Sequence, residues 1–86
     1  MVTIKHFTAS WCQPCKQLTP IMKSIVSNNS NINYQIIDVD NDPVIAQKYG
    51  VRSVPFVVFE KNGIIREQIV GLMSKSYYES VLLNIS

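Results

Sequence analysis

The stretch Trp11–Lys16, with the sequence Trp-Cys-Gln-Pro-Cys-Lys, constrains this chain more than any other. It holds both cysteines and the single tryptophan. The apolar run before it, residues 1–8, indicates a strand, and the amphipathic pattern after it, residues 14–27, indicates a helix. We therefore expect the two cysteines to lie where a strand leads into a helix.

That position favours a reactive thiol, because a helix begins with unpaired backbone N–H groups and partial positive charge. We expect Cys12 at or beside the N-cap, where the pKa of a cysteine falls from about 8.5 into a range of about 3.5–7.5. Pro14 suits the first helical turn, since its missing N–H is not needed there. Cys15 follows about one turn later on the same face, so the two sulfurs can close a small disulfide ring. In this arrangement Cys12 is the exposed nucleophile and Cys15 the recessed resolving thiol.

Length, charge and cysteine usage exclude several classes of function. The 86 residues suffice for a single small domain, residues 1–86, with a modest core. A net charge of +2 without a basic run argues against nucleic-acid binding, and no apolar stretch reaches the roughly 20 residues of a membrane span. Lys5 and His6 interrupt the N-terminal apolar run, so it lacks a signal-peptide pattern and we expect a cytoplasmic protein. Two cysteines three positions apart indicate redox chemistry more than a structural framework.

The rest of the pattern predicts an α/β fold. The elements follow the order β-α-β-α-β-β-α, which indicates a four-stranded mixed sheet with helices on both faces. Strands are expected over residues 2–8, 34–39, 56–59 and 64–70, and helices over residues 14–27, 43–49 and from Ser74 onward. Lys61–Gly63 is a strong hairpin signal between the last two strands. Pro20 is expected to kink the first helix.

Taken together, these motifs resemble the thioredoxin family. The resemblance covers nearly the whole chain and rests on Trp11–Lys16, Pro20, Asp38–Asp40 with Pro43, Tyr49–Pro55, Lys61–Gly63 and Val70–Gly71. It implies a compact thioredoxin fold of four strands and three helices. It also implies a protein-disulfide reductase, in which Cys12 attacks a substrate disulfide and Cys15 resolves the mixed disulfide.

The resemblance further implies partners and additional site residues. Pro55 would follow a cis peptide bond beside the cysteines, and the backbone of Val54 would pair with an extended substrate strand. A flat apolar docking surface would consist of Trp11, Val54, Pro55, Gly71 and Leu72. The substrates would be proteins that contain disulfides, and a separate reductant, for which we expect a thioredoxin reductase, would restore the dithiol. We expect a monomer that needs neither a cofactor nor a metal ion.

Three positions depart from the usual pattern of the family. Alignment on the cysteines puts His6 and Ile36 where thioredoxins often carry a buried aspartate and a nearby lysine, and Gln13 replaces the commoner glycine. We expect His6 to point toward the helix that carries Cys15. A neutral imidazole there, with a reference pKa of about 6.5, could accept the Cys15 proton. The alternative is that His6 is an ordinary packing residue.

Other functions stay open at this point. A zinc site would need more ligands than Cys12 and Cys15, and His6 is the only further soft ligand. A purely structural disulfide is disfavoured, since long loops are absent. A glutathione-dependent glutaredoxin is the enzymatic alternative, because residues 53–55 are close to its Thr-Val-Pro, but residues 71–74 lack the second glycine and the acidic residue that hold glutathione. The remaining alternative is a non-catalytic binding module that uses the same surface.

Overall fold

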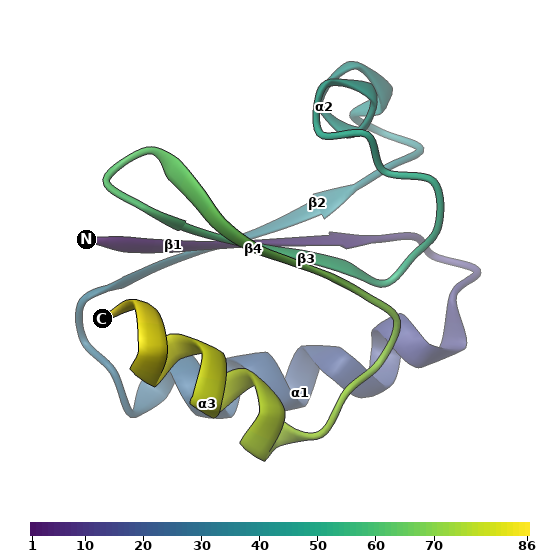
Figure 1. Ribbon diagram of the computed structural model, residues 1–86. Helices are drawn as coiled ribbons and strands as arrows, with labels where there is room; N and C mark the ends of the chain where they lie inside the picture. Colours follow the sequence, from purple (N-terminus) through teal and green to yellow (C-terminus); the bar gives the residue numbers. More distant parts are fainter.

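The computed structural model describes residues 1–86. The elements follow the predicted order: β1 Val2–Thr8, α1 Gln13–Ser27, β2 Ile32–Asp38, α2 Pro43–Lys48, β3 Phe56–Lys61, β4 Ile64–Val70 and α3 Lys75–Ile85. The strands form one sheet in the order β2-β1-β3-β4, in which β1 and β2 are parallel and the other pairs antiparallel. Helices α1 and α3 cover one face of the sheet, and α2 lies on the other (Figure 1). The predicted mixed sheet with helices on both faces is confirmed.

Alternation along the central strand β1 divides the core between the two faces of the sheet. Val2 and Ile4 belong to the larger cluster, which joins the sheet to Leu18, Met22 and Ile25 of α1 and to Tyr78, Leu82 and Ile85 of α3. Phe7 points the other way, into a smaller cluster with Ile37, Ala46, Phe56 and Val58. His6 has the same parity as Ile4 and therefore lies on the side of α1.

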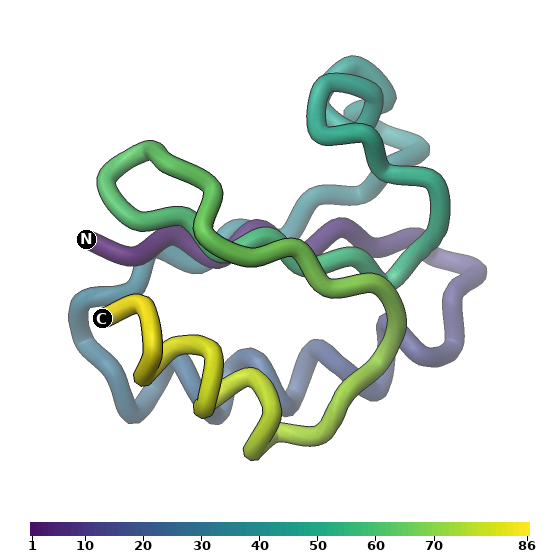
Figure 2. The backbone as a smooth tube through the Cα atoms, viewed as in Figure 1, coloured from purple at the N-terminus to yellow at the C-terminus, as the bar shows by residue number.

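The chain turns from β1 into α1 at one end of the molecule, and both termini lie at the other end (Figure 2). Helix α1 begins at Gln13, one residue before the predicted start, with Pro14 in its first turn. Pro20 lies inside the helix, which nevertheless continues to Ser27. The strand-to-helix junction predicted for the cysteines is confirmed.

The predicted bounds of the second strand, residues 34–39, were wrong at both ends. Strand β2 starts at Ile32, because its pairing with β1 extends back to the row of Val2 and Ile32. It ends at Asp38, which pairs with Thr8, the last residue of β1. The partner strand therefore sets the length of β2, and the polar residues around its start conceal this in the sequence.

The predicted hairpin turn between the last two strands is confirmed, and the ends of the helices have recognisable caps. Asn62 and Gly63 adopt positive φ values of 54° and 82° between β3 and β4, as the predicted hairpin requires. Gly50 follows α2 with a φ of 69°. Ser74 caps α3, since its side chain accepts a hydrogen bond from the backbone N–H of Tyr77 at 3.2 Å.

Candidate active site

Cys12 occupies the N-cap of α1 with an extended backbone, as the sequence predicted. Its Sγ accepts a hydrogen bond from the backbone N–H of Cys15 at 3.2 Å. The two sulfurs are joined in a disulfide bond, and the Cα atoms are 5.3 Å apart. Because an N–H group and the positive end of the helix both face Cys12 Sγ, negative charge on that sulfur is stabilised after reduction.

Cys12 is more buried than we predicted. Only 3% of its surface is exposed, and Cys15 is fully buried. Both cysteines pack with Ala9 against Val39 and Val54, which come from loops distant in the sequence. The prediction of an exposed nucleophile was therefore wrong for the disulfide form, although Cys12 is still the outer of the two residues.

Trp11 projects from the protein beside the disulfide. Its side chain is 67% exposed, and the indole Nε1–H donates a hydrogen bond to Asp40 Oδ2 at 3.0 Å. Trp11 also lines a shallow recess of about 110 Å³, whose other lining residues are Val39, Val51, Arg52, Ser53 and Val54. The exposed indole is thus held in one orientation next to a largely apolar hollow.

The segment around Pro55 completes this surface. The Val54–Pro55 peptide bond is cis, as predicted, and Val54 packs against the cysteine cluster. The carbonyl of Pro55 accepts a hydrogen bond from the N–H of Gly71 at 2.9 Å, which ties the start of β3 to the end of β4. Leu72 packs partly against the core under α3. Of the predicted docking residues, Trp11 and Val54 line one recess and Gly71 is bonded to Pro55. The Pro55 side chain is fully buried, which corrects its predicted place on the surface.

His6 is completely buried and has one polar partner. Its Nδ1 lies 3.0 Å from the hydroxyl oxygen of Tyr34, and the two rings are stacked with their centroids 6.4 Å apart. Its Nε2 is buried without a hydrogen-bond partner. Burial lowers the pKa of His6 to about 4 and raises the pKa of Tyr34 to about 12, so both side chains are neutral at neutral pH.

Sequence reasoning did not associate Tyr34 with the site. Tyr34 belongs to the edge strand β2 and pairs with Ile4 rather than with His6. Since residues two apart in a strand share one face, the register of the parallel strands would have shown that these rings meet. Ile36, the residue at the family's lysine position, is opposite His6 and is half-exposed.

Comparison with known proteins decides the family. Residues 2–83 match the family model for thioredoxin. The chain belongs to the thioredoxin family. It is 41% identical to the thioredoxin of Rickettsia bellii over 71 residues, covering 81% of this chain and 68% of that protein. It is 32% identical to thioredoxin-1 of Caenorhabditis elegans over 85 residues, covering 99% of this chain and 74% of that protein.

Solved structures agree with this assignment. A mutant thioredoxin from Halobacterium salinarum superposes with a TM-score of 0.90 at 31% identity, over 96% of this chain and 73% of that one. Oxidised mitochondrial thioredoxin 3 from Saccharomyces cerevisiae gives a TM-score of 0.89 at 26% identity, over 96% of this chain and 77% of that one. The mixed sheet and three helices are therefore the thioredoxin fold, as predicted.

The thioredoxin family and the disulfide between Cys12 and Cys15 define the activity. The chain is a thiol–disulfide oxidoreductase with disulfide reductase activity, and its redox centre is the Cys-Gln-Pro-Cys motif at the start of α1. A disulfide and a dithiol interconvert by thiolate attack on a sulfur, which requires no bound cofactor. The predicted function is confirmed at this level.

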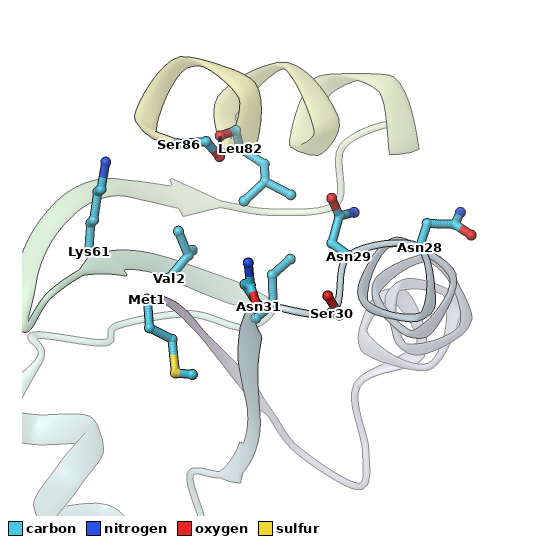
Figure 3. A pocket seen from close by; sticks show the side chains of 10 residues that line it. Met1, Val2, Asn28, Asn29, Ser30, Asn31, Lys61, Leu82 and Ser86 are labelled. Carbon is cyan, nitrogen blue, oxygen red and sulfur yellow. Dashed lines mark hydrogen bonds between the residues drawn. The ribbon is translucent and has the colours of Figure 1, made fainter.

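Away from this thioredoxin-type centre, a recess of about 440 Å³ lies at the end of the molecule where the termini meet. It is lined by Met1, Val2, Asn28, Asn29, Ser30, Asn31, Ile32, Lys61, Leu82 and Ser86 (Figure 3). None of the predicted site residues contributes to it. No group of three or more His, Cys, Asp or Glu side chains is arranged to hold a metal ion. No helix has both the length and the apolar character that crossing a membrane requires.

Proposed function

We propose that the chain reduces disulfide bonds in other proteins by an ordered exchange in which Cys12 attacks first. The observation that carries this order is the hydrogen bond from the N–H of Cys15 to Cys12 Sγ, because it favours a thiolate at Cys12. The Cys12 thiolate attacks one sulfur of a substrate disulfide, and the other substrate sulfur leaves as a thiolate that takes up a proton.

The second step releases the substrate. Cys15 loses its proton and attacks Cys12 Sγ, which breaks the bond between Cys12 and the substrate. The second substrate sulfur leaves as a thiolate and is protonated, and the bond between Cys12 and Cys15 forms. Two electrons have passed from the dithiol to the substrate. The full burial of Cys15 supports its role as the resolving thiol, since no large substrate can reach it.

The substrate binds on the docking surface formed by Trp11, Val54, Pro55, Gly71 and Leu72. Neither the N–H nor the C=O of Val54 has a hydrogen-bond partner within the chain, which supports pairing with an extended substrate segment. Trp11 offers an exposed apolar face on one side of the cysteines. Gly71, which has a φ of 88° and no side chain, has open space where a Cβ would lie.

The electron donor in this proposal is a thioredoxin reductase, and the protein acts as a monomer in the cytoplasm. Membership of the thioredoxin family supports this donor. The residues after Gly71, namely Leu72, Met73 and Ser74, also lack the acidic side chain that glutaredoxins use to hold glutathione.

Insulin reduction tests the proposal. NADPH with a thioredoxin reductase is expected to sustain faster turnover than NADPH with glutathione and glutathione reductase. A dithiol donor serves as the control that reports reductase activity without either enzyme. Faster turnover with glutathione would assign the protein to glutathione-linked chemistry, and no turnover with any donor would indicate a binding module.

A further inference from the structure

The exchange described above makes no use of the one buried histidine. His6 lies entirely inside the protein, with Nδ1 bonded to Tyr34 and Nε2 left without a partner. An unsatisfied polar atom in the interior lowers stability, so its retention calls for an explanation. A role for His6 in the second step of the exchange supplies one, and that role rests on the proposed function.

The order of residues along β1 and α1 puts His6 at the same end of the molecule as the cysteines. On the inner face of β1, Val2 and Ile4 precede His6, so His6 is the nearest of the three to the end where the chain turns into α1 (Figure 2). Helix α1 runs back from that end, and its buried residues are, in order, Cys15, Leu18, Met22 and Ile25. Leu18, Met22 and Ile25 belong to the cluster of Val2 and Ile4. Cys15 is therefore the buried residue of α1 nearest the end of the molecule where His6 lies.

The hydrogen bond to Tyr34 sets the direction of the imidazole ring. Tyr34 lies in the row of Ile4, two residues nearer the start of β1 than His6. Nδ1 is thus occupied by a side chain from the edge strand β2. Nε2, which is buried without a partner in the chain, is the nitrogen left free to take a proton.

We propose that His6 accepts the Cys15 proton during resolution and that Tyr34 is the positioning residue that prepares it to do so. In this scheme Nδ1–H donates to the Tyr34 hydroxyl oxygen, which leaves the lone pair on Nε2. The Cys15 Sγ–H bond breaks, its proton passes to Nε2, and the sulfur electron pair attacks Cys12 Sγ. The substrate thiolate leaves and takes up a proton, and the imidazolium returns its own proton to solvent.

The titratable and charged groups around His6 determine when it can take a proton, and the decisive one is Cys15. His6 lies in the layer between the sheet and helices α1 and α3. The uncharged titratable groups that face this layer include Tyr34 from β2, Cys15 from α1 and Tyr78 from α3, whose hydroxyl is bonded to the backbone of Gly71 and Met73. The buried residues of β3 and β4 on this face, Val57, Phe59 and Ile69, are apolar. Lys61 and Glu67 share the face by register, as partners of Val2 and Phe59, but Glu67 is exposed, Lys61 is half-buried, and neither is in the row of His6 and Val57. The ion pair of Lys5 and Glu60 is on the opposite face of the sheet. The lysines and acidic residues of α1 and α3 are exposed or half-exposed and lie outside the layer.

With no fixed charge beside it, His6 stays neutral while Cys15 is in the disulfide. A thiolate forming at Cys15 is then the only buried negative charge on this face of the sheet, and it favours the imidazolium. Protonation of His6 and ionisation of Cys15 are thus coupled, and neither requires a permanent buried charge.

Single-turnover kinetics from pH 5 to pH 9, which separate attack from resolution, test the proposal. At pH 7 we expect resolution to slow about 100-fold in His6→Asn and about 10-fold in Tyr34→Phe, since general base catalysis contributes about 10²–10⁴-fold. The attack step should change by less than about twofold. Resolution in His6→Asn should rise steadily with pH, because hydroxide then replaces the base, whereas the unmodified protein should show a flatter profile.

Tyr49→Phe is the matched control, because the hydroxyl that it removes bonds Glu60 at 2.7 Å on the other face of the sheet. It is expected to keep the original pH profile even if it lowers the melting temperature. Nitrogen NMR shifts of His6 in the oxidised protein provide a second readout that needs no variant, and the Nδ1–H tautomer is expected.

Two results would overturn the inference. The first is an unchanged pH profile for resolution in Tyr34→Phe and His6→Asn, and the second is an Nε2–H tautomer of His6. Absence of the attack step in the unmodified protein would instead defeat the proposed function, and with it the basis for this step. The two failures are therefore distinguishable in one kinetic record.

Discussion

The backbone N–H of Cys15 donates a hydrogen bond to the Sγ of Cys12, 3.2 Å away, across the first turn of α1. This contact makes two chemically identical residues inequivalent. Cys12 receives the N–H group and the positive end of the helix, whereas Cys15 is fully buried. The difference between the cysteines leads to the first prediction.

Cys15→Ser is expected to accumulate mixed disulfides with substrate proteins, because Cys12 can still attack but nothing resolves the product. Cys12→Ser should form none and should lose reductase activity, because Cys15 is fully buried. Mass spectrometry of protein trapped from an insulin reaction measures both. Equal trapping by the two variants would contradict the assigned roles.

Trp11→Ala is expected to raise KM for a protein disulfide about tenfold, since buried aromatic anchors often contribute about 1 kcal/mol or more to an interface. The folded state should be little affected, because the indole is 67% exposed. Leu83→Ala is a matched control, since it removes a side chain on α3 that is 78% exposed. A comparable rise in KM for both variants would show that Trp11 has no special part in docking.

Lys5→Met is expected to lower the free energy of unfolding by about 3 kcal/mol, because it leaves Glu60 as an unpaired, largely buried charge. The two side chains are 16% and 9% exposed, with Lys5 Nζ 3.2 Å from Glu60 Oε1. Replacing both residues by Met and Leu should recover much of the loss. Urea unfolding of the two single variants and the double variant measures the coupling free energy between Lys5 and Glu60. If the losses of the two single variants simply add in the double variant, the two side chains are not coupled and the prediction is wrong.

The same pair should respond to alkaline pH. Burial by itself would lower the pKa of Lys5, but hydrogen bonds to Glu60 and Tyr49 outweigh it and raise the pKa above its ordinary value. The stabilisation is therefore complete at neutral pH, and it is lost as pH rises through the raised value. In Lys5→Met this alkaline component of the unfolding curve should be absent.

Acid should destabilise the oxidised protein through His6. Its pKa is about 4 in the folded state and about 6.5 when unfolded, so the unfolded chain binds more protons between these values. Stability should be fully present above about pH 6.5 and fall by about 3 kcal/mol as pH decreases to about 4. Thermal unfolding of the unmodified protein and of His6→Asn across this range gives the measurement. If the two proteins lose stability in parallel, another group is responsible.

Much of this protein follows from local features of the sequence. The bounds of β1 and β4, the turn at Asn62 and Gly63 and the start of the last helix at Ser74 were all correct, because alternation, turn conformation and helix starts depend on neighbours along the chain. The redox centre was equally local, since a Cys-x-x-Cys spacing at a strand-to-helix junction is enough to place both sulfurs on one helical turn. Resemblance to the thioredoxin family supplied the cis bond before Pro55.

Tertiary structure decided what depends on segments far apart in the sequence. The start of β2 is set by pairing with β1, and the burial of Cys12 by Val39 and Val54. The bonded pairs His6–Tyr34, Trp11–Asp40 and Lys5–Glu60 join residues that are 28, 29 and 55 positions apart. Periodicity shows which face of a strand a residue occupies, but only the strand order and register show which side chain it meets there. The chemical environment of His6 is therefore a property of the assembled sheet.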